Sequence, residues 1–375
     1  MILYLTINDQ PSGVYWSQVT DVVNMLDRDA RHDVRLLALV SLREYSKIKK
    51  QIKAHCPKAI VLPMYPKMQN WKKNGPIVRS VCRSKKVQAI IARGAFATSV
   101  AINARDKGAC KKVCFDARGA YAAEWNEYRI IDDNALIASV EGVERKAILQ
   151  ADFRLSVSEV LVKHWRDHYR YSGTEHVVIP CTLGADHSDL PVNNSIRDKM
   201  GVAGDETLLV YSGSTAGWQS FELLRKMSSK ALKEDPKLKV LFLSKEDENN
   251  EALKSDFPDQ VIVKWLKPSE VSGHLNVCDV GILIREDSVT NQVSSPTKFA
   301  EYLNAGLNVL ISKRIGDMSA FVEEHGCGKV IEEDMGHFVP PIAEERERNR
   351  ALARTYFTKE AFAREYAKIM EVVSN

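Results

Sequence analysis

The sequence lacks the motifs that mark several large enzyme classes. No G-x-G-x-x-G follows the first apolar run, which disfavours nicotinamide binding, and no G-x-x-x-x-G-K-[ST] is present, which excludes a P-loop NTPase. No H-E-x-x-H or paired-carboxylate motif indicates metal-assisted hydrolysis, and the nine histidines do not cluster. Internal repeats and low-complexity segments are also missing. The chemistry of the chain must therefore come from residues outside these motifs.

Long apolar runs and paired cysteines are missing as well. The seven cysteines are scattered and contain no C-x-x-C, which argues against a zinc site and a disulfide framework and favours a reducing compartment. No stretch approaches the ~18 consecutive apolar residues that a transmembrane helix needs. The N-terminal segment "MILYLTIND" has no basic region before its apolar run, so we interpret it as a strand and not as a signal peptide. We expect a cytoplasmic protein.

Acidic residues are scarce in one part of the chain. Residues 43–86 contain thirteen Lys or Arg and one acid, Glu44, so the net charge of this window is +12. The net charge of the whole chain is +4, which leaves −8 for the other residues. The window also contains apolar and aromatic residues: Tyr45, Met64, Tyr65, Met68 and Trp71. Cations beside such residues suit an anionic membrane surface, although a solvated helix face with an acid-poor loop also explains them. Nucleic acid suits such a patch too, but we expect no nucleic-acid partner.

The length and the pattern of apolar runs predict two α/β domains. A chain of 375 residues exceeds the roughly 250–300 residues that one core supports. Short apolar runs alternate with helical patterns, and the alternation starts again after the turn-rich segment 181–195, "CTLGADHSDLPVNNS". We therefore expect a doubly wound parallel sheet in residues 1–183, a second in residues 184–355, and a helix over residues 356–375. Parallel sheets of this kind bind ligands at the carboxyl ends of their strands.

The segment from Arg285 to Leu310 contains the strongest candidate site. Arg285 directly follows an apolar strand, and after a polar loop Ser294, Ser295 and Pro296 are predicted to open a helix, with serine at the N-cap and proline in the first turn. Free N–H groups at such a helix start form an anion site.

Two charged residues follow in the predicted helix. Lys298 is unfavourable for the helix dipole but suits a bound phosphate, and Glu301, three residues on, is placed to accept the hydroxyls of a ribose. An i, i+3 surface ion pair between the two is the alternative. Gly306 is predicted to end the helix.

This segment, "SSPTKFAEYLNAGLNV", resembles the donor-binding segment of glycosyltransferase family 4, the retaining GT-B enzymes, in which "(S/A)SPTK(F/L)xEYLxxGxPV" is common. Asn308 stands where proline is frequent. The first glutamate of the family's two-glutamate pattern is missing, with Val293 or Ser294 near its place, so the resemblance implies that the loop backbone and Ser294 contact the sugar.

Shorter resemblances run along the rest of the chain. "GVERKAILQADFRLSVSEVLVKHW" and "VVIPCTLGAD" are similar to family segments. "LLVYSGSTAGWQS" looks like the loop that opens the second domain of the family, with Gly213, Ser214 and Trp218 matching. Gln219 replaces the basic residue that many relatives place on the diphosphate, so the charge must come from Lys298 and Arg285.

The first domain carries weaker signals. Gly13 lies in the loop after the first strand, where members of the family often have a glycine-rich turn. Arg93, Asp116 and Arg118 end strands, in the segments "ARGAFA" and "FDARGAYAAEW", and relatives carry D-x-RG at the second. With Glu124, these residues are candidates to bind sugar hydroxyls through bidentate contacts. A salt-bridge cluster that holds the loop is the alternative.

The resemblance implies a GT-B enzyme, with two Rossmann-like domains facing a cleft and the C-terminal helix crossing back to the acceptor-side N-terminal domain. It implies retaining transfer from a nucleotide-diphosphate sugar to an acceptor hydroxyl of a glycan. Our hypothesis for the basic window 43–86 is that it docks on anionic lipid at the inner face of the plasma membrane, so that a lipid-linked acceptor reaches the cleft, as in bacterial surface polysaccharide synthesis. "REDS" is not D-x-D, so no metal or other cofactor is implied. A non-catalytic binding protein, a sugar-nucleotide epimerase or hydrolase and a nucleic-acid-binding protein are the alternatives.

The predicted roles divide the candidates into three sets. The catalytic residues are Arg285, Lys298, Glu301 and Asp116. The donor-binding residues are Gly13, Gly213, Ser214, Ser294, Ser295, Pro296, Thr297, Lys298 and Glu301. The substrate-binding residues are Arg93, Arg118, Glu124 and Trp218.

Overall fold

A computed structural model describes residues 1–28, 32–185 and 192–374. The chain divides into two compact units, one formed by Met1–Ala185 and Lys359–Asn375 and the other by Asp186–Thr358. These are called unit 1 and unit 2 below, and each is described by itself. Residues 186–191 of the predicted linker lie outside the described residues. Across the described ranges, every helix is too short or too polar to cross a membrane.

Unit 1 is built on a seven-stranded parallel sheet with the order β3-β2-β1-β4-β5-β6-β7. Its strands are β1 (Ile2–Ile7), β2 (Val34–Val40), β3 (Ile60–Pro63), β4 (Ala89–Arg93), β5 (Lys112–Asp116), β6 (Phe153–Ser156) and β7 (His176–Val178). Its α-helices are α1 (Gly13–Tyr15), α2 (Asp21–Arg28), α3 (Tyr45–His55), α4 (Gly75–Lys85), α5 (Ala95–Asp106), α6 (Tyr121–Tyr128), α7 (Asn134–Gln150), α8 (Glu159–Tyr169) and α17 (Ala363–Ser374). A π-helical segment, η1 (Trp16–Thr20), joins α1 to α2, and η2 (Leu42–Glu44), η3 (Met68–Asn74) and η5 (Glu360–Phe362) are 3₁₀ turns.

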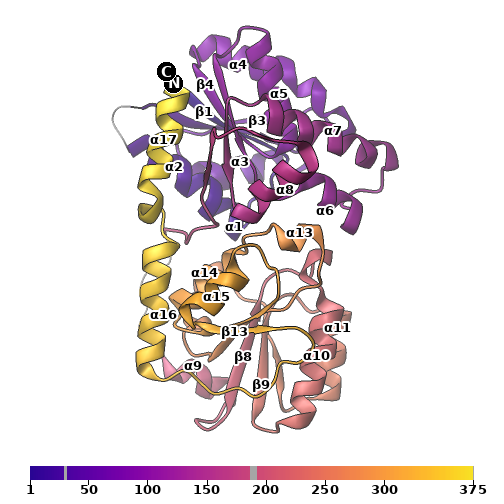
Figure 1. Cartoon of the computed structure of the whole chain (residues 1–375), viewed down its shortest axis with the longest axis vertical. Coiled ribbons are helices and arrows are strands. Elements are labelled where there is room, and N and C mark those ends of the chain that lie inside the picture. The colour runs from indigo at the N-terminus through magenta and orange to yellow at the C-terminus, as the bar shows by residue number, and fades with distance from the viewer. Residues whose placement is uncertain (29–31, 186–191, 375) are drawn as a thin grey trace. The chain divides into compact units, whose positions relative to one another are not determined.

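Burial of both faces explains why the strands of unit 1 are apolar throughout. Ile2 and Tyr4 of β1 point into a core shared with α2, α3 and α17, and the alternating Leu3 and Leu5 are also fully buried. In α17, Tyr366, Ile369, Met370 and Val373 follow helical spacing and pack into the same core. The predicted return of the C-terminal helix to the first domain is therefore confirmed (Figure 1).

Unit 2 is built on a six-stranded parallel sheet with the order β10-β9-β8-β11-β12-β13. Its strands are β8 (Thr207–Ser212), β9 (Leu238–Leu243), β10 (Val261–Val263), β11 (Val280–Leu283), β12 (Asn308–Ser312) and β13 (Gly328–Ile331). Its α-helices are α9 (Asn194–Lys199), α10 (Phe221–Glu234), α11 (Glu248–Asp256), α12 (Pro268–Leu275), α13 (Val289–Gln292), α14 (Thr297–Asn304), α15 (Met318–His325) and α16 (Ala343–Tyr356), and η4 (Gly217–Gln219) is a 3₁₀ turn. The predicted fold class, two doubly wound parallel α/β domains, is confirmed.

The order of the strands defines one switch point in each sheet. In unit 1 the chain builds outward from β1 through β2 and β3, and then continues on the other side of β1 with β4. Unit 2 does the same at β8 and β11. Crevices outside the carboxyl ends of the strands at such a point are the usual ligand sites of open α/β sheets. The two switch points are therefore where candidate residues should be sought.

Candidate functional site

In unit 2, Arg285 lies at the switch point. It follows β11 by two residues, and its backbone N–H donates to the Ser312 hydroxyl at the end of β12, at 2.9 Å. Its guanidinium is buried and donates to the side-chain oxygen of Gln219 at 3.0 Å, with the oxygens of Asn291 and Ser294 at 3.4 and 3.5 Å. These neutral acceptors fix the orientation of the cation.

The loop after β8 forms the other side of this switch point. It contains Gly213, Ser214, Trp218 and Gln219, so these predicted residues lie on the same sheet edge as Arg285. Two hydrogen bonds join the loops: Arg285 donates to Gln219, and the Glu286 amide donates to the Ser220 hydroxyl at 2.8 Å.

A tyrosine of α14 anchors the start of the same loop. The Tyr302 hydroxyl, fully buried, accepts from the Ser212 amide at 2.9 Å, at the last residue of β8. The loops that follow β8 and β11 are thereby held in register with α14, the helix of the predicted donor segment.

The predicted start of this helix is wrong in one detail. The structure places Pro296 at the N-cap of α14, with no side-chain cap, and the helix begins at Thr297. The Ser294 amide and hydroxyl both donate to the Asn291 carbonyl, at 3.2 and 2.8 Å, because α13 forms a short turn just before. The amide of Ser294 is therefore used by this turn, and the helix-start amides proposed to bind an anion shift to Thr297 and Lys298.

Lys298 and Glu301 form the i, i+3 pair that the sequence left as an alternative. The ammonium lies 2.6 Å from the carboxylate, and the two side chains are 27% and 15% exposed. Such a partly accessible pair can open when a stronger anion competes for the ammonium, so the pairing is compatible with ligand binding.

A pocket of about 550 Å³ opens beside the loop after β8. Its lining comes from that loop, the first turn of α10, α11 and the loop after β11: Thr215, Ala216, Gly217, Ser220, Phe221, Glu222, Leu223, Lys226, Asn249 and Glu286. Ser220 has φ +52°, a left-handed conformation uncommon for serine. This bend brings the Ser220 hydroxyl to the amide of Glu286, and so shapes the rim of the pocket.

Sequence reasoning missed Trp265. It follows β10 by two residues, its side chain is 66% exposed, and the Lys245 ammonium lies 5.3 Å from its ring centroid. Lys245 follows β9, so both residues lie at the carboxyl edge of the sheet. The signal that identifies Trp265 is its position directly after an apolar strand, because an exposed tryptophan there offers a flat surface for a planar ligand.

In unit 1, a buried charge cluster occupies the switch point. Asp116 ends β5 and is 2% exposed; its carboxylate accepts from the Tyr4 hydroxyl and faces Arg118 at 3.3 Å and Arg93 at 3.6 Å. Arg93, at the end of β4, also pairs with Asp9 after β1 at 3.3 Å. The structure thus brings together the predicted Arg93, Asp116 and Arg118 in the salt-bridge arrangement given above as the alternative to sugar binding.

Gln18 connects this cluster to the π-helical segment η1. Its side-chain oxygen accepts from Arg118 at 2.9 Å, and its side-chain nitrogen donates to the Thr182 carbonyl at 2.6 Å. Gly13 lies five residues before, at the start of α1, where a Cβ would meet nothing within 4 Å. The position of Gly13 therefore does not itself require glycine.

Glu124 is held in a different environment. It lies on α6 near Glu144, a fully buried carboxylate that accepts from the amides of Tyr121 and Ala122 and from the Tyr169 hydroxyl. Burial, and then the like charge of Glu144, raise the pKa of Glu124 to about 7. Glu124 therefore changes its charge near neutral pH.

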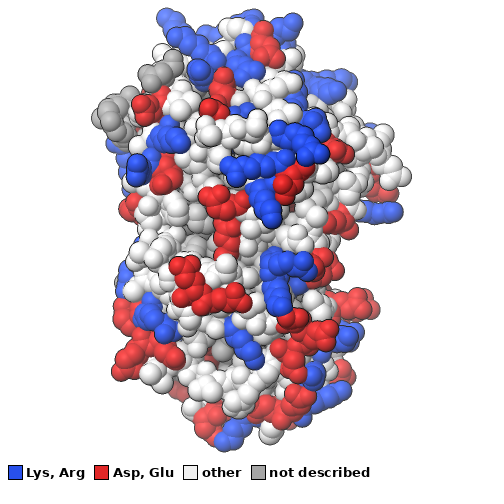
Figure 2. Space-filling view, viewed as in Figure 1, with Lys and Arg blue, Asp and Glu red and all other residues white. Residues whose placement is uncertain are grey.

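The residues of window 43–86 differ in burial. Most of its Lys and Arg are exposed, and on the face drawn in Figure 2 basic side chains gather over the part of unit 1 that contains α4 and α5. Met64 and Trp71, counted above among the possible membrane contacts, are buried, whereas Tyr65 is 41% exposed with the Lys73 ammonium 4.8 Å from its ring centroid. The charge of the window is thus available to a partner, and little of its apolar surface is.

Across the described residues, no group of His, Cys, Asp and Glu is arranged to hold a metal ion. All seven cysteines are free thiols, and all except the half-buried Cys181 are buried.

No protein-family model and no curated protein sequence matches this chain. Solved structures do. A glycosyltransferase from Rickettsia africae ESF-5 aligns with TM-score 0.71 and 14% identity over 100% of this chain and 98% of its own. Anabaena Alr3699/HepE, solved in complex with UDP, aligns with TM-score 0.70 and 12% identity over 99% of each chain. WaaG, a glycosyltransferase involved in lipopolysaccharide biosynthesis, aligns with TM-score 0.63 and 15% identity over 100% of this chain and 94% of its own. At these identities the likeness shows the fold, which is GT-B.

Proposed function

We propose that this chain is a glycosyltransferase that moves a sugar from a nucleotide-diphosphate donor to an acceptor hydroxyl, with retention of the anomeric configuration. The supporting observation is the switch point of unit 2, where Arg285, the loop from Gly213 to Gln219 and Ser294 in the turn before α14 come together. Ligands of doubly wound sheets bind at this place. The GT-B fold, shared with a structure solved with UDP, is consistent with such a donor.

The proposed chemistry is electrostatic. As the bond between sugar and diphosphate breaks, negative charge develops on the leaving diphosphate. The Arg285 guanidinium, preoriented by Gln219, and the Lys298 ammonium would stabilise that charge. Lys298 would exchange its 2.6 Å contact with Glu301 for the diphosphate, which frees the Glu301 carboxylate to accept the ribose hydroxyls.

We assign the charge cluster of unit 1 a positioning role. The carboxylate of Asp116 is buried and engaged by Tyr4, Arg93 and Arg118, so we propose that it holds the neighbouring strands β1, β4 and β5 together and does not touch the sugar. Acceptor contacts would then come from other groups of unit 1, among them the half-buried Glu124.

Trp265 is our candidate for the nucleotide base. Its exposed ring offers a stacking platform, and Lys245 adds positive charge beside it.

Donor binding tests the proposal directly. Isothermal titration with UDP-, GDP-, ADP- and CDP-sugars should show heat with one nucleotide class. Lys298→Ala should then raise Kd by at least tenfold, because a charge-assisted contact to phosphate is lost. Lys230→Ala, which breaks the exposed pair with Asp334 in the same unit, should leave Kd unchanged.

Absence of heat with all four classes contradicts the proposal, as does an equal effect of the two substitutions. Product analysis without an acceptor separates transfer from epimerisation or hydrolysis, and a protein that binds the donor without any turnover is a non-catalytic binding protein.

For the acceptor, we propose a lipid-linked glycan of a bacterial surface polysaccharide, reached when the exposed cations of window 43–86 dock on the anionic inner face of the plasma membrane. Because Met64 and Trp71 are buried, this docking would be mainly electrostatic. Co-sedimentation with phosphatidylglycerol vesicles should therefore fall steeply as salt rises. Lack of sedimentation at low salt would rule the docking out.

A further inference from the structure

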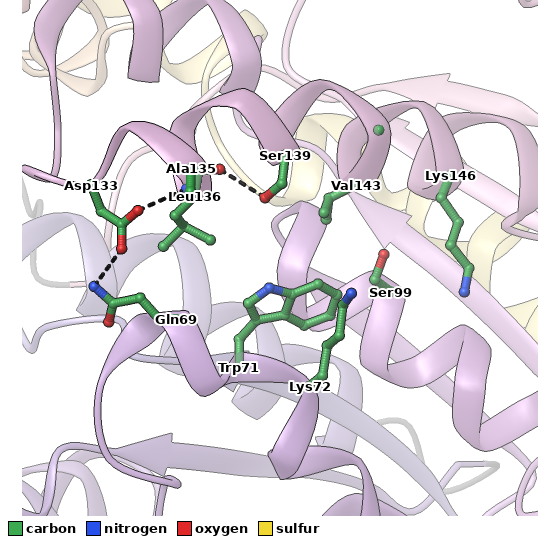
Figure 3. A pocket seen from close by; sticks show the side chains of 11 residues that line it. Gln69, Trp71, Lys72, Ser99, Asp133, Ala135, Leu136, Ser139, Val143 and Lys146 are labelled. Atoms are coloured by element: carbon green, nitrogen blue, oxygen red, sulfur yellow. Dashed lines mark hydrogen bonds between the residues drawn. The ribbon is translucent and has the colours of Figure 1, made fainter.

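A second pocket, of about 560 Å³, lies within unit 1 away from the charge cluster (Figure 3). It is formed by η3, α5 and α7 from its N-cap to Lys146, and its lining is Gln69, Trp71, Lys72, Ser99, Asp133, Ala135, Leu136, Ser139, Gly142, Val143 and Lys146. The volume falls within the roughly 300–1,000 Å³ of small-molecule sites. The proposed transfer reaction assigns it no role.

Ser99 is the feature of this pocket that calls for an explanation. It lies on the second turn of α5 and is only 3% exposed, and its hydroxyl makes no hydrogen bond to any described residue. A buried helical serine can donate to a carbonyl one turn before, as Thr98 beside it does to Gly94 at 2.8 Å. A buried hydroxyl without a partner is costly, and in Figure 3 this one points toward the α7 side of the pocket.

Two cations flank the same space. Lys72 of η3 and Lys146 of α7 both line the pocket, and in Figure 3 the Ser99 hydroxyl lies between the ends of their side chains. Neither ammonium forms an ion pair with a carboxylate in the described parts of the chain. Other lysines of the basic window do: Lys47 pairs with Glu44, and Lys58 with Asp27.

The acid of the pocket is already engaged. The Asp133 carboxylate accepts from the Gln69 side chain at 2.8 Å and from the Leu136 amide at 2.9 Å, as the N-cap of α7. These hydrogen bonds lower its pKa and keep it charged at neutral pH. With two cations and one acid, the pocket has a net positive charge.

We propose that this pocket binds a phosphate group, with Lys72 and Lys146 supplying the charge and the Ser99 hydroxyl a hydrogen bond. The volume leaves space for the group that carries the phosphate, beside the apolar Leu136 and Val143. A free sugar phosphate and the headgroup of an anionic phospholipid share this chemistry. The inference does not depend on the glycosyl transfer proposed above.

The experiment uses the full chain with Lys298→Ala as the reference, so that phosphate binding at the proposed donor site is reduced. Isothermal titration with glucose 6-phosphate, and with glucose as the uncharged match, gives the affinity for a free sugar phosphate. Vesicles of phosphatidylglycerol in phosphatidylcholine test the lipid source. Lys72→Ala/Lys146→Ala is compared with Lys107→Ala/Lys111→Ala, which removes the same charge from exposed positions of unit 1 that lie outside the pocket and outside window 43–86.

The Lys72/Lys146 variant should weaken glucose 6-phosphate or vesicle binding at least tenfold, and Ser99→Ala should weaken it threefold or more. The Lys107/Lys111 variant should change it less than twofold. Loss with glucose 6-phosphate identifies a free sugar phosphate, and loss with vesicles alone identifies a lipid headgroup. The proposal is overturned if neither probe binds, if glucose binds as well as its phosphate, if Ser99→Ala has no effect, or if the two lysine pairs weaken binding equally.

Discussion

Replacing Asp116 by asparagine should destabilise unit 1 strongly. The substitution keeps the shape of the side chain but removes the charge that faces Arg118 at 3.3 Å and Arg93 at 3.6 Å. At an effective dielectric constant of about 20, each of these attractions amounts to about 5 kcal/mol before desolvation is subtracted. Among the described residues, Asp9 then remains as the one acid of the cluster for two guanidinium side chains that are only 12% and 14% exposed. Removing one partner from a buried ion pair typically costs about 3–5 kcal/mol, and we expect a loss in that range.

Urea unfolding followed by tryptophan fluorescence measures this loss, because Trp16, Trp71, Trp125 and Trp165 all belong to unit 1. Asp33→Asn is the matched control. Its partner Arg35 lies at 2.9 Å, but the two side chains are 43% and 34% exposed, so the expected loss is below about 1 kcal/mol.

A double variant sharpens the test. Adding Arg118→Gln to Asp116→Asn restores the charge balance of the cluster, so part of the lost stability should return, with a coupling free energy above about 1 kcal/mol. A loss below about 1 kcal/mol for Asp116→Asn alone, together with impaired turnover, would refute the positioning role and assign the carboxylate to the substrate.

Two further substitutions test other features. Gly316→Ala should lower the free energy of unfolding by at least about 2 kcal/mol more than Gly326→Ala, as measured by thermal unfolding. Both glycines have positive φ, but an added Cβ collides with the Ser294 carbonyl at Gly316 and meets nothing within 4 Å at Gly326. Equal losses for the two variants would contradict this reasoning. The pKa of Glu124 is raised from 4.5 to about 7, so its stabilising contribution is complete below pH 4.5 and is lost as pH rises through 7. Between pH 5 and pH 8, the free energy of unfolding of Glu124→Gln should therefore rise by about 2–3 kcal/mol relative to that of the wild type. A stability difference that does not change with pH would show that Glu124 titrates normally.

The sequence predicts the strands of both sheets because buried parallel strands are apolar on both faces. "ILYLTI" and "TLLVYS" are buried along their whole length in the structure, and both were evident as apolar runs. Helices without such a pattern are not predictable in this way. In α11, "ENNEALKSD", only Asn250 and Leu253 are buried, and α9 buries no residue, so neither has an apolar stripe that marks it in the sequence.

The candidate sites divide in the same way. The sequence itself indicates the candidates Arg285 and Lys298, because each follows a local signal, the end of a strand or the start of a helix. The contacts that orient them are not: Gln219 lies 66 residues from Arg285, and Tyr4 lies 112 residues from Asp116. The sequence predicts a serine at the N-cap of α14, but the structure has Pro296 there, because the Ser294 amide donates to the Asn291 carbonyl in the turn before the helix. Tertiary hydrogen bonds of this kind leave no periodic trace in the sequence.

The last helix has a consequence for how the protein is made. Tyr366, Ile369, Met370 and Val373 of α17 complete the core of unit 1, yet the ribosome adds them after it has made the whole of unit 2. Domains usually fold in the order of their synthesis. Here the part of the apolar core that α17 covers stays exposed until α17 has been made, so a nascent chain halted before Ala363 would present that part to chaperones and proteases.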